Sequence, residues 1–486
     1  MRLQGEVGRR KGLTSGGDAG REHKMEYHDF VASKRRRHEP AGFDPPDLHP
    51  SLFDHQRAIV AWACRMGRCA IFADTGLGKT RMQLEWCRAV SDHVGRPVLL
   101  IAPLSVIPQT IREAAVIGIH ATRVGGGGDV VLTNYERVDG MDVSPFAGVA
   151  LDESSILKSY DGATRTMLIE RFAATPYRLA CTATPAPNDH TELGNHAEFL
   201  GVSTRQEMLA EFFVHDGSSS SARGWRLKGH ARSDFWAWVA TWAVVVRKPS
   251  DLGYDDRGYD LPPLRIHQVM VGDEPQPEEG ALFSAPAMGL NDQRRARRET
   301  MADRIDRARS LAAGDDPCIV WCELNDESTA AAQAIDGSVE VRGSDTPDDK
   351  ADRLDRFSTG EARVIVTKPS IAGFGMNWQH CRRMVFIGAT HSYESFYQAV
   401  RRCWRFGQRS PVDVYVLQTP KDGAIVASLA RKAEAADEMA AQMVALMRDE
   451  QMAAVVGRRA GSPPPADDAV TIPDWLRTQE DNDACH

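Results

Sequence analysis

The sequence predicts an α/β protein with two tandem lobes, each a parallel sheet with helices on both faces, joined by a tryptophan- and arginine-rich helical insertion. Three observations support this prediction. Short apolar or β-branched runs alternate with helix-like segments in two separate series, a pattern typical of buried parallel strands. A glycine-rich loop follows the first run and precedes a helix-like segment. Between the two series the composition shifts to serine, proline, aromatic residues and arginine.

The length and composition are those of a globular protein with more than one domain. A chain of 486 residues, 42% apolar and 26% charged, is long enough for two or three domains. No apolar run approaches the roughly 18 residues of a membrane-spanning helix, so we expect no membrane partner. The nine cysteines include no CxxC pair, which argues against a disulfide framework or a structural zinc site and favours a cytoplasmic location.

Composition also divides the chain into six segments. The two ends have few apolar positions and are predicted to be flexible tails. Apolar positions at helical spacing near the C-terminus predict a helix that packs on the second lobe. We expect a basic tail at residues 1–44, the first lobe at 45–200 and the insertion at 201–300. The second lobe follows at 301–420, the C-terminal helix at 421–456 and the acidic tail at 457–486.

The strands of both lobes are predicted from short apolar or β-branched runs. In the first lobe these runs are residues 70–73, 98–102, 130–133, 148–151 and 178–181. In the second lobe they are residues 318–321, 339–341, 364–367, 384–388 and 412–417.

The most specific motif is the loop after the first predicted strand, Asp74-Thr75-Gly76-Leu77-Gly78-Lys79-Thr80. Glycines let backbone amides surround phosphate oxygens, and the N-terminus of the following helix attracts the same anion. In such a loop Lys79 reaches the β- and γ-phosphates, and the Thr80 hydroxyl can ligate Mg²⁺. The whole loop is therefore predicted to bind ATP with Mg²⁺.

An acidic pair follows the fourth predicted strand. Asp152 at the tip of a buried strand can hold Mg²⁺, and its neighbour Glu153 can polarise the attacking water. An Asp-Glu pair alone would usually be a solvated loop, but this one follows a hydrophobic strand in a chain with a phosphate loop. We therefore predict Lys79, Asp152 and Glu153 to be catalytic, with Thr80 and Asp152 as the metal ligands.

These residues resemble the motifs of superfamily 2 helicases and translocases, and within them the SNF2-like branch. The phosphate loop resembles motif I, and Gln56 stands where the family's glutamine reads the adenine edge. Motifs Ia, Ib, II and III are resembled by residues 102–105, 133–136, 152–158 and 182–185 with Asn188. The resemblance covers residues 45–420 and implies two RecA-like lobes.

The second half of the chain carries the family's remaining motifs. Residues 371–377 resemble motif V, and residues 398–408 resemble motif VI. The resemblance implies that Arg402 and Arg405 reach the γ-phosphate from the second lobe as catalytic arginines. It also implies nucleotide-binding roles for Gly375 and Gln408.

The chain departs from the family pattern at four positions. Motif II has Ser154 and Ser155 in place of an alanine and an acidic residue or histidine, and motif VI has Arg401 and Trp404 in place of an acidic residue and a histidine. The linker is also shorter than in chromatin remodellers. The chain therefore looks like a compact prokaryotic or phage-type member of the DEAD/DEAH-like helicases.

The insertion combines aromatic and basic residues. Trp238 and Trp242 are four residues apart, at helical spacing, and we interpret Trp236, Trp238 and Trp242 as core residues. Trp225 and Arg223 are better candidates for contact with a nucleic-acid strand, since unpaired bases stack on exposed aromatic rings. A second basic stretch, residues 294–309, contains interleaved aspartates and is expected to be a solvated helix with ion pairs.

The function we expect is a nucleic-acid-stimulated ATPase, a DNA translocase or helicase that moves along duplex or single-stranded DNA. Because the net charge is −8, nucleic acid must bind a local basic surface. An RNA helicase remains an alternative. A further alternative is an ATP-binding clamp or motor subunit recruited to a nuclease, methyltransferase, replication or recombination partner.

Overall fold

The computed structural model describes residues 38–158, 162–186, 189–215, 224–259, 261–272, 298–372, 376–388, 392–419 and 422–456. Both sheets belong to one compact unit, Glu39–His486. The predicted tail at 457–486, nearly all of the tail at 1–44, and Asn188, Arg223 and Gly375 lie outside the described residues.

The first lobe is built on a seven-stranded sheet in which every pairing is parallel, in the order β3-β4-β2-β5-β6-β1-β9. Its strands are β1 (Arg68–Ala73), β2 (Val98–Ile101), β3 (Ala121–Arg123), β4 (Val130–Thr133), β5 (Gly148–Asp152), β6 (Tyr177–Thr182) and β9 (Ala243–Val246). Its helices are α2 (Asp54–Met66), α3 (Lys79–Val94), α4 (Ile107–Val116), α5 (Ala163–Arg171), α6 (Leu193–Leu200), α7 (Arg205–Phe212) and α8 (Arg232–Ala240).

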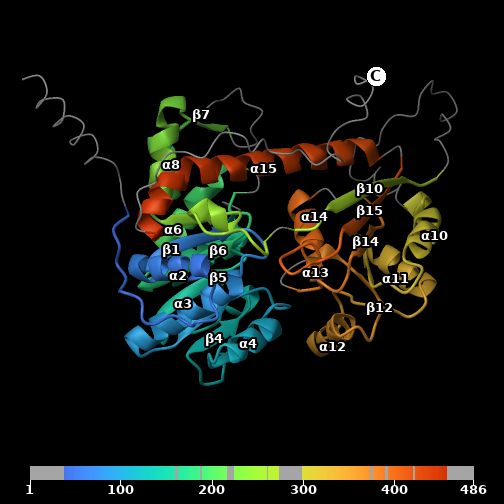
Figure 1. Ribbon diagram of the computed structural model, residues 1–486, viewed down its shortest axis with the longest axis horizontal. Helices are drawn as coiled ribbons and strands as arrows, with labels where there is room; N and C mark the ends of the chain where they lie inside the picture. Colours follow the sequence, from blue (N-terminus) through green and yellow to red (C-terminus); the bar gives the residue numbers. More distant parts are fainter. Residues whose placement is uncertain are drawn as a thin grey trace, which may run out of the picture. The chain divides into compact units, whose positions relative to one another are not determined.

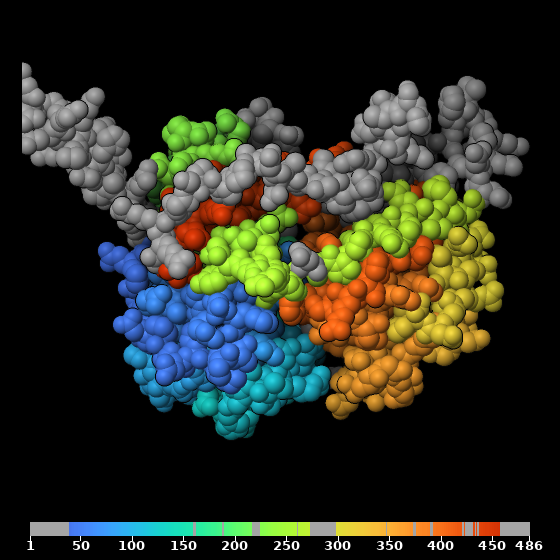
Figure 2. All heavy atoms as spheres, viewed as in Figure 1, coloured from blue at the N-terminus to red at the C-terminus, as the bar shows by residue number. Residues whose placement is uncertain are grey.

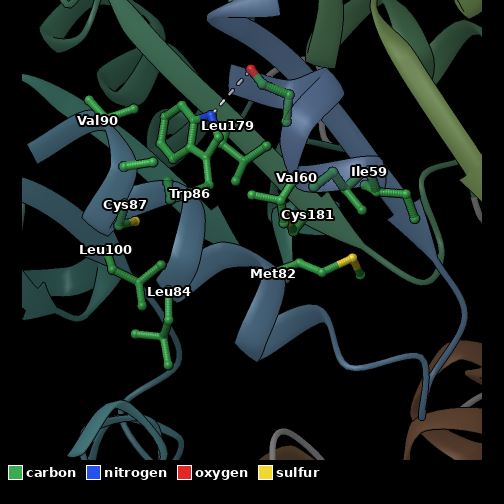
Figure 3. Close-up of a cluster of buried hydrophobic side chains, with 14 of the residues drawn as sticks. Ile59, Val60, Met82, Leu84, Trp86, Cys87, Val90, Leu100, Leu179 and Cys181 are labelled. Atoms are coloured by element: carbon green, nitrogen blue, oxygen red, sulfur yellow. Dashed lines mark hydrogen bonds between the residues drawn. The ribbon is translucent and has the colours of Figure 1, made fainter. Parts of the chain in front are cut away.

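Both faces of this sheet are buried because most positions of its strands are apolar. On β2, Leu100 belongs to a core cluster with α2 and α3, whereas Leu99 and Ile101 belong to a cluster with α5, α6 and α8. Figure 3 shows the first of these clusters, in which the fully buried Trp86 indole donates a hydrogen bond to the Ala63 carbonyl at 3.3 Å. The helices therefore cover both faces of the sheet, as predicted.

The second lobe has a six-stranded sheet, also parallel throughout, in the order β10-β15-β14-β11-β13-β12. Its strands are β10 (Leu264–Met270), β11 (Cys318–Trp321), β12 (Ser338–Glu340), β13 (Val364–Thr367), β14 (Arg383–Phe386) and β15 (Val412–Gln418). Its helices are α10 (Met301–Leu311), α11 (Asn325–Ala334), α12 (Pro347–Ser358), α13 (Pro369–Ala372) and α14 (Tyr393–Val400). The predicted fold class of two tandem RecA-like lobes is confirmed.

Shorter elements connect these parts. A two-stranded antiparallel ribbon pairs β7 (Phe213–His215) with β8 (Trp225–Leu227). Single-turn 3₁₀ helices are η1 (Tyr135–Arg137), η2 (Ser154–Lys158), η3 (His190–Glu192), η4 (Gly229–Ala231) and η5 (Pro249–Leu252). The last helix, α15 (Gly423–Gln451), continues into the π-helical turn η7 (Met452–Val456).

The segment predicted as a separate insertion contributes to both sheets, which corrects that expectation. The run Ala243–Val246 forms β9 beside β1, and Leu264–Met270 forms β10 beside β15. A four-residue apolar run is typical of a buried parallel strand, but the aromatic and basic residues around it obscured the signal. As expected, Trp236, Trp238 and Trp242 are core residues.

The C-terminal helix packs mainly on the first lobe, contrary to the expectation that it packs on the second. Met443 and Met447 of α15 are buried in the cluster that contains α8, and Arg232 of α8 donates a hydrogen bond to Gln442 at 2.6 Å. Figure 1 shows α15 beside α8. Helical spacing identifies an apolar face but not the surface that covers it.

Arg304, in the arginine-rich stretch predicted to be solvated, is buried instead. Its guanidinium donates to the carbonyls of Ile387 and Leu417 at 2.9 and 3.0 Å and to the Asp422 carboxylate. The side chain is only 1% exposed. Burial is possible because acceptors satisfy the charge on every side.

We predict that Arg304→Ala destabilises the second lobe by about 3–5 kcal/mol, because it leaves the Asp422 carboxylate without its cation. Arg309→Ala is the matched control on the same helix, since that arginine is 61% exposed and surface changes cost about 0.5 kcal/mol or less. Urea unfolding of both variants measures the difference. Equal effects would show that the Arg304 network does not stabilise the lobe.

Candidate active site

The loops that carry the predicted motifs lie at one edge of the first sheet. Since all its strands are parallel, the carboxyl ends of β1, β2, β4, β5 and β6 meet at that edge. The phosphate loop follows β1, and the acidic pair ends β5, two strands away. This edge of an open α/β sheet is where ligands bind.

The phosphate loop has the backbone that its glycines permit. Gly76 and Gly78 have positive φ values of 93° and 80°, which side chains disfavour. A Cβ at Gly76 would lie 2.9 Å from the Phe406 amide nitrogen, and one at Gly78 would lie 2.3 Å from the Gln56 amide. The loop therefore requires glycine for both conformation and space.

Lys79 begins α3 and its ammonium group lies inside the loop. It donates to the Ala73 and Asp74 carbonyls at 2.7 and 3.2 Å. Burial lowers the pKa of Lys79, whereas the carboxylates of Glu153, Asp74 and Asp152 act in the opposite direction. The two carbonyl oxygens carry only partial negative charge. An anion in the loop would compensate the positive charge of Lys79 more completely.

Gln56 lies against the phosphate loop, but its amide is already engaged. Its nitrogen donates to the Leu77 carbonyl at 2.9 Å, and its oxygen accepts from the Phe53 amide at 3.0 Å. The side chain is buried. These contacts tie α2 to the loop, and a nucleobase reached by Gln56 would share the same amide.

Asp152 is held at the end of β5 by two neighbours. Gln83 of α3 donates to its carboxylate at 2.9 Å, and Tyr135 donates to its backbone carbonyl at 2.5 Å. Burial raises the pKa of Asp152, and the Gln83 hydrogen bond and the Lys79 charge oppose that rise. The carboxylate thus lies close to the lysine of the phosphate loop.

Glu153 has the features of a group that reacts. It has a φ of 54°, the single positive value on a non-glycine residue in the described part of the chain, and such strain concentrates at functional sites. Its Oε2 atom is buried and has no hydrogen-bond partner among the described residues. Burial, followed by the Asp152 charge, raises the pKa of Glu153 to about 7. A carboxylate with this pKa can accept a proton near neutral pH.

The altered third position of motif II has a specific partner. The Ser154 hydroxyl lies 3.2 Å from Nε2 of His196, a buried histidine of α6. Burial lowers the pKa of His196 to about 4, so the ring is neutral. This contact could not be predicted from the sequence because the two residues belong to different elements.

The two predicted catalytic arginines converge on one atom in the second lobe. Arg402 and Arg405 each donate to the Met376 carbonyl at 3.3 Å. Arg402 also donates to the Gln398 carbonyl and side chain. Burial and the neighbouring charge of Arg405 lower the pKa of Arg402 to about 10, whereas Glu153 opposes that shift. Two adjacent cations that share one carbonyl acceptor form an arrangement suited to an anion.

The end of α14 and the start of motif VI touch the phosphate loop directly, through residues that were not predicted as site residues. The Tyr397 hydroxyl and Arg401 guanidinium donate to the Asp74 carboxylate at 2.6 and 2.9 Å. One turn earlier on α14, Glu394 forms an ion pair with Lys158 of the first lobe. The spacing of Glu394, Tyr397 and Arg401 on one helix could have indicated a shared face.

A cavity of about 990 Å³ opens between the two lobes beside Glu153. Residues of motifs Ia, Ib and II line it from the first lobe, and α12, α13 and the start of α14 line it from the second. Figure 2 shows α4 and α12 on opposite sides of a hollow. Its lining includes Glu153 but none of residues 74–80, so the cavity borders the acidic pair rather than the phosphate loop.

An aromatic cluster that the sequence did not reveal lies beside Gln56. The rings of Phe53, Tyr259 and Phe406 come together, with a centroid distance of 4.7 Å between Tyr259 and Phe406. Phe53 is 49% exposed. Residues from three distant segments thus form an aromatic surface next to the phosphate loop.

Gln408 has a different environment from the one expected. Its amide nitrogen lies within 3.3 Å of the carbonyls of Gln379, Cys381 and Cys403, and its oxygen accepts from the amides of Arg409 and Ser410. With both ends saturated inside the second lobe, Gln408 holds the loop of motif VI together. A nucleotide contact of Gln408 stays a prediction.

Two searches of the described residues bear on metals and membranes. No group of three or more His, Cys, Asp or Glu residues is placed to hold a metal ion. Mg²⁺ in nucleotide sites needs only one or two protein ligands beside phosphate oxygens and water, so the prediction of Thr80 and Asp152 as its ligands does not require such a group. Within the described residues, every helix is too short or too polar to cross a bilayer.

Comparisons with known proteins find one family match, in the second lobe. Residues 303–407 match the model of the helicase conserved C-terminal domain. This match supports the predicted relationship to superfamily 2 helicases. A search of curated proteins finds no match. The SWI2/SNF2 ATPase core of Sulfolobus solfataricus, solved in complex with double-stranded DNA, is similar at 17% identity and a TM-score of 0.39 over 85% of this chain and 98% of that one.

We predict that Glu153→Gln stabilises the protein more at pH 8 than at pH 5.5. The raised pKa of Glu153, about 7 against a usual 4.5, means that stability is lost as the pH rises from about 4.5 to 7, because folding then opposes ionisation. A neutral glutamine removes this cost, so its melting temperature should exceed that of the wild type by a few degrees at pH 8.

Asp129→Asn is the control, a carboxylate at the start of β4 on the opposite edge of the sheet. Thermal melts at both pH values compare the two variants with the wild type. A gain for Glu153→Gln that is the same at both pH values would contradict the assigned pKa.

Proposed function

We propose that the chain is a nucleic-acid-stimulated ATPase that acts as an ATP-dependent DNA translocase or helicase of the SNF2-like branch. The proposal rests on the combination of groups at one site. The phosphate loop lies at the same sheet edge as Glu153, which has a strained backbone and an unpartnered carboxylate oxygen. The part of the chain that matches a helicase C-terminal domain contributes two converging arginines near that carboxylate. The first part binds and hydrolyses a nucleotide, and the second senses its γ-phosphate.

Each residue has a separate task in this proposal. Lys79 transfers its hydrogen bonds from the Ala73 and Asp74 carbonyls to the phosphates. Thr80 and Asp152 would hold Mg²⁺, which when bound would supply positive charge beside the phosphate oxygens. Glu153 accepts the proton of the attacking water through its free Oε2 atom. The step needs no covalent intermediate with the protein.

Arg402 and Arg405 would complete the site from the second lobe. They share the Met376 carbonyl as acceptor, and Arg405 has a buried Nε with no hydrogen-bond partner in the described residues. A γ-phosphate offers both side chains a stronger acceptor than a shared carbonyl. ATP would thereby draw the two lobes together, and hydrolysis would release them.

DNA is the proposed track because motif I resembles the SNF2-like form, and motif VI resembles it apart from Arg401 and Trp404. Motifs Ia and Ib follow β2 and β4 at the same edge as the nucleotide loop, so strand contact and hydrolysis are adjacent. Because the chain is acidic overall, its affinity for DNA depends on local cations and falls with salt.

The decisive experiment measures steady-state ATP hydrolysis with duplex DNA, single-stranded DNA and RNA at one salt concentration. We expect turnover stimulated most by DNA, and loss of turnover with retained ATP binding in Glu153→Gln. Lys79→Ala should lose ATP binding itself. Hydrolysis stimulated only by RNA would contradict the DNA assignment, and a Glu153→Gln variant with wild-type turnover would contradict the proposed base.

We predict that Arg402→Ala or Arg405→Ala lowers kcat by roughly 10³ or more while changing ATP affinity only several-fold, as when an arginine finger is lost. The double variant should cost less than the product of the two single effects, because both side chains act on one charge. Single-turnover hydrolysis and equilibrium binding separate the two quantities. An unchanged kcat in both single variants would remove these arginines from the mechanism.

A further inference from the structure

One face of α14 reaches across to the phosphate loop. Glu394 and Tyr397 of α14, and Arg401 at its C-cap, occupy positions i, i+3 and i+7, which lie on the same side of a helix. Glu394 pairs with Lys158, and the other two bind Asp74. The contact therefore joins the second lobe to the nucleotide loop rather than to the general surface of the first lobe.

The contact stabilises the ionised form of the Asp74 carboxylate. Its carboxylate accepts from the Tyr397 hydroxyl and the Thr75 amide, both at 2.6 Å, and from Arg401 at 2.9 Å. Its side chain is 19% exposed. Burial alone would raise the pKa of Asp74, but Arg401, with Tyr397 and Lys79, holds that pKa below its usual value. Without Arg401 the anion would be largely buried and poorly compensated.

Arg401 is itself held in a fixed orientation. Its guanidinium lies over the rings of Trp404 and Tyr397, at 4.5 and 5.0 Å from the centroids. Trp404 is fixed in turn by a hydrogen bond of 2.6 Å to the Pro262 carbonyl. The two residues at which motif VI departs from the family pattern, Arg401 and Trp404, thus form one unit aimed at Asp74.

A carboxylate in a phosphate loop affects anion binding directly. Asp74 is bonded to the Thr75 amide, and its own carbonyl accepts from Lys79 at 3.2 Å. An uncompensated negative charge here would repel a triphosphate and would attract Lys79 away from it. A cation on the far side of Asp74 removes the repulsion and keeps the carboxylate turned toward the second lobe.

We propose that Arg401 is a positioning residue for the nucleotide site, which sets nucleotide affinity by holding and neutralising Asp74 from the second lobe. It does so without touching the nucleotide. Binding of ATP to the first lobe is then strong only while α14 is in place against the loop. The inference rests on the proposed function, because it assumes that ATP occupies the phosphate loop.

The test compares the binding of a fluorescent ATP analogue, mant-ATP, with steady-state kinetics. Arg401→Ala should raise the dissociation constant and KM about tenfold or more and leave kcat at saturation within several-fold. This is the opposite of the pattern expected for Arg402→Ala. Arg401→Lys should recover part of the affinity. Arg409→Ala, an exposed arginine nearby, is the matched control and should bind mant-ATP as the wild type does.

A second substitution makes the test independent of folding defects. Asp74→Asn in the Arg401→Ala background removes the uncompensated charge and should restore most of the lost affinity. An Arg401→Ala variant with wild-type affinity, or a double variant no better than Arg401→Ala, would overturn the inference while leaving the proposed function intact. Failure of the wild-type chain itself to bind mant-ATP would overturn the proposed function and the inference with it.

Discussion

The parallel direction of every strand in both sheets is the constraint on which the rest of the structure depends. It places the carboxyl ends of β1, β5 and β6 at one edge, so that residues far apart in the sequence share a site. The same constraint in the second sheet places motifs V and VI together after β13 and β14. Because both faces of a parallel sheet must be covered, the site is confined to this edge.

Charge in this confined site is balanced across the two lobes. Asp74 is compensated by Arg401, and Lys79 by three carboxylates. Glu153 is the carboxylate left with an unpartnered oxygen and a raised pKa. Burying an ion without a partner costs free energy. The protein bears this cost at Glu153, the group proposed to take up a proton. The remaining charges serve to hold the loops in position.

The sequence was sufficient to predict the fold class, the phosphate loop and the acidic pair, because each of these follows from local composition and spacing. The strands β9 and β10 were missed because their short runs are embedded in aromatic and basic residues. Long-range partners could not be predicted at all. The contact of His196 with Ser154, the burial of Arg304 and the packing of α15 on α8 depend on the tertiary arrangement.

Motif VI contains both features that the sequence predicted and features that it could not predict. Its arginines were recognisable from their spacing, but the sequence could not tell which of them faces the phosphate loop. The structure places Arg401 against Asp74 and draws Arg402 and Arg405 to the Met376 carbonyl. Gln408 was assigned to the nucleotide by resemblance, yet its amide closes the loop of its own lobe.

The central claim is that one nucleotide site is shared by the two lobes, and a crystal structure with Mg²⁺ and a non-hydrolysable ATP analogue tests it most directly. The account predicts a triphosphate bound to Lys79 and the loop amides, with Arg402 and Arg405 released from the Met376 carbonyl to contact the γ-phosphate. An analogue bound by the first lobe alone, with both arginines still on Met376, would contradict it.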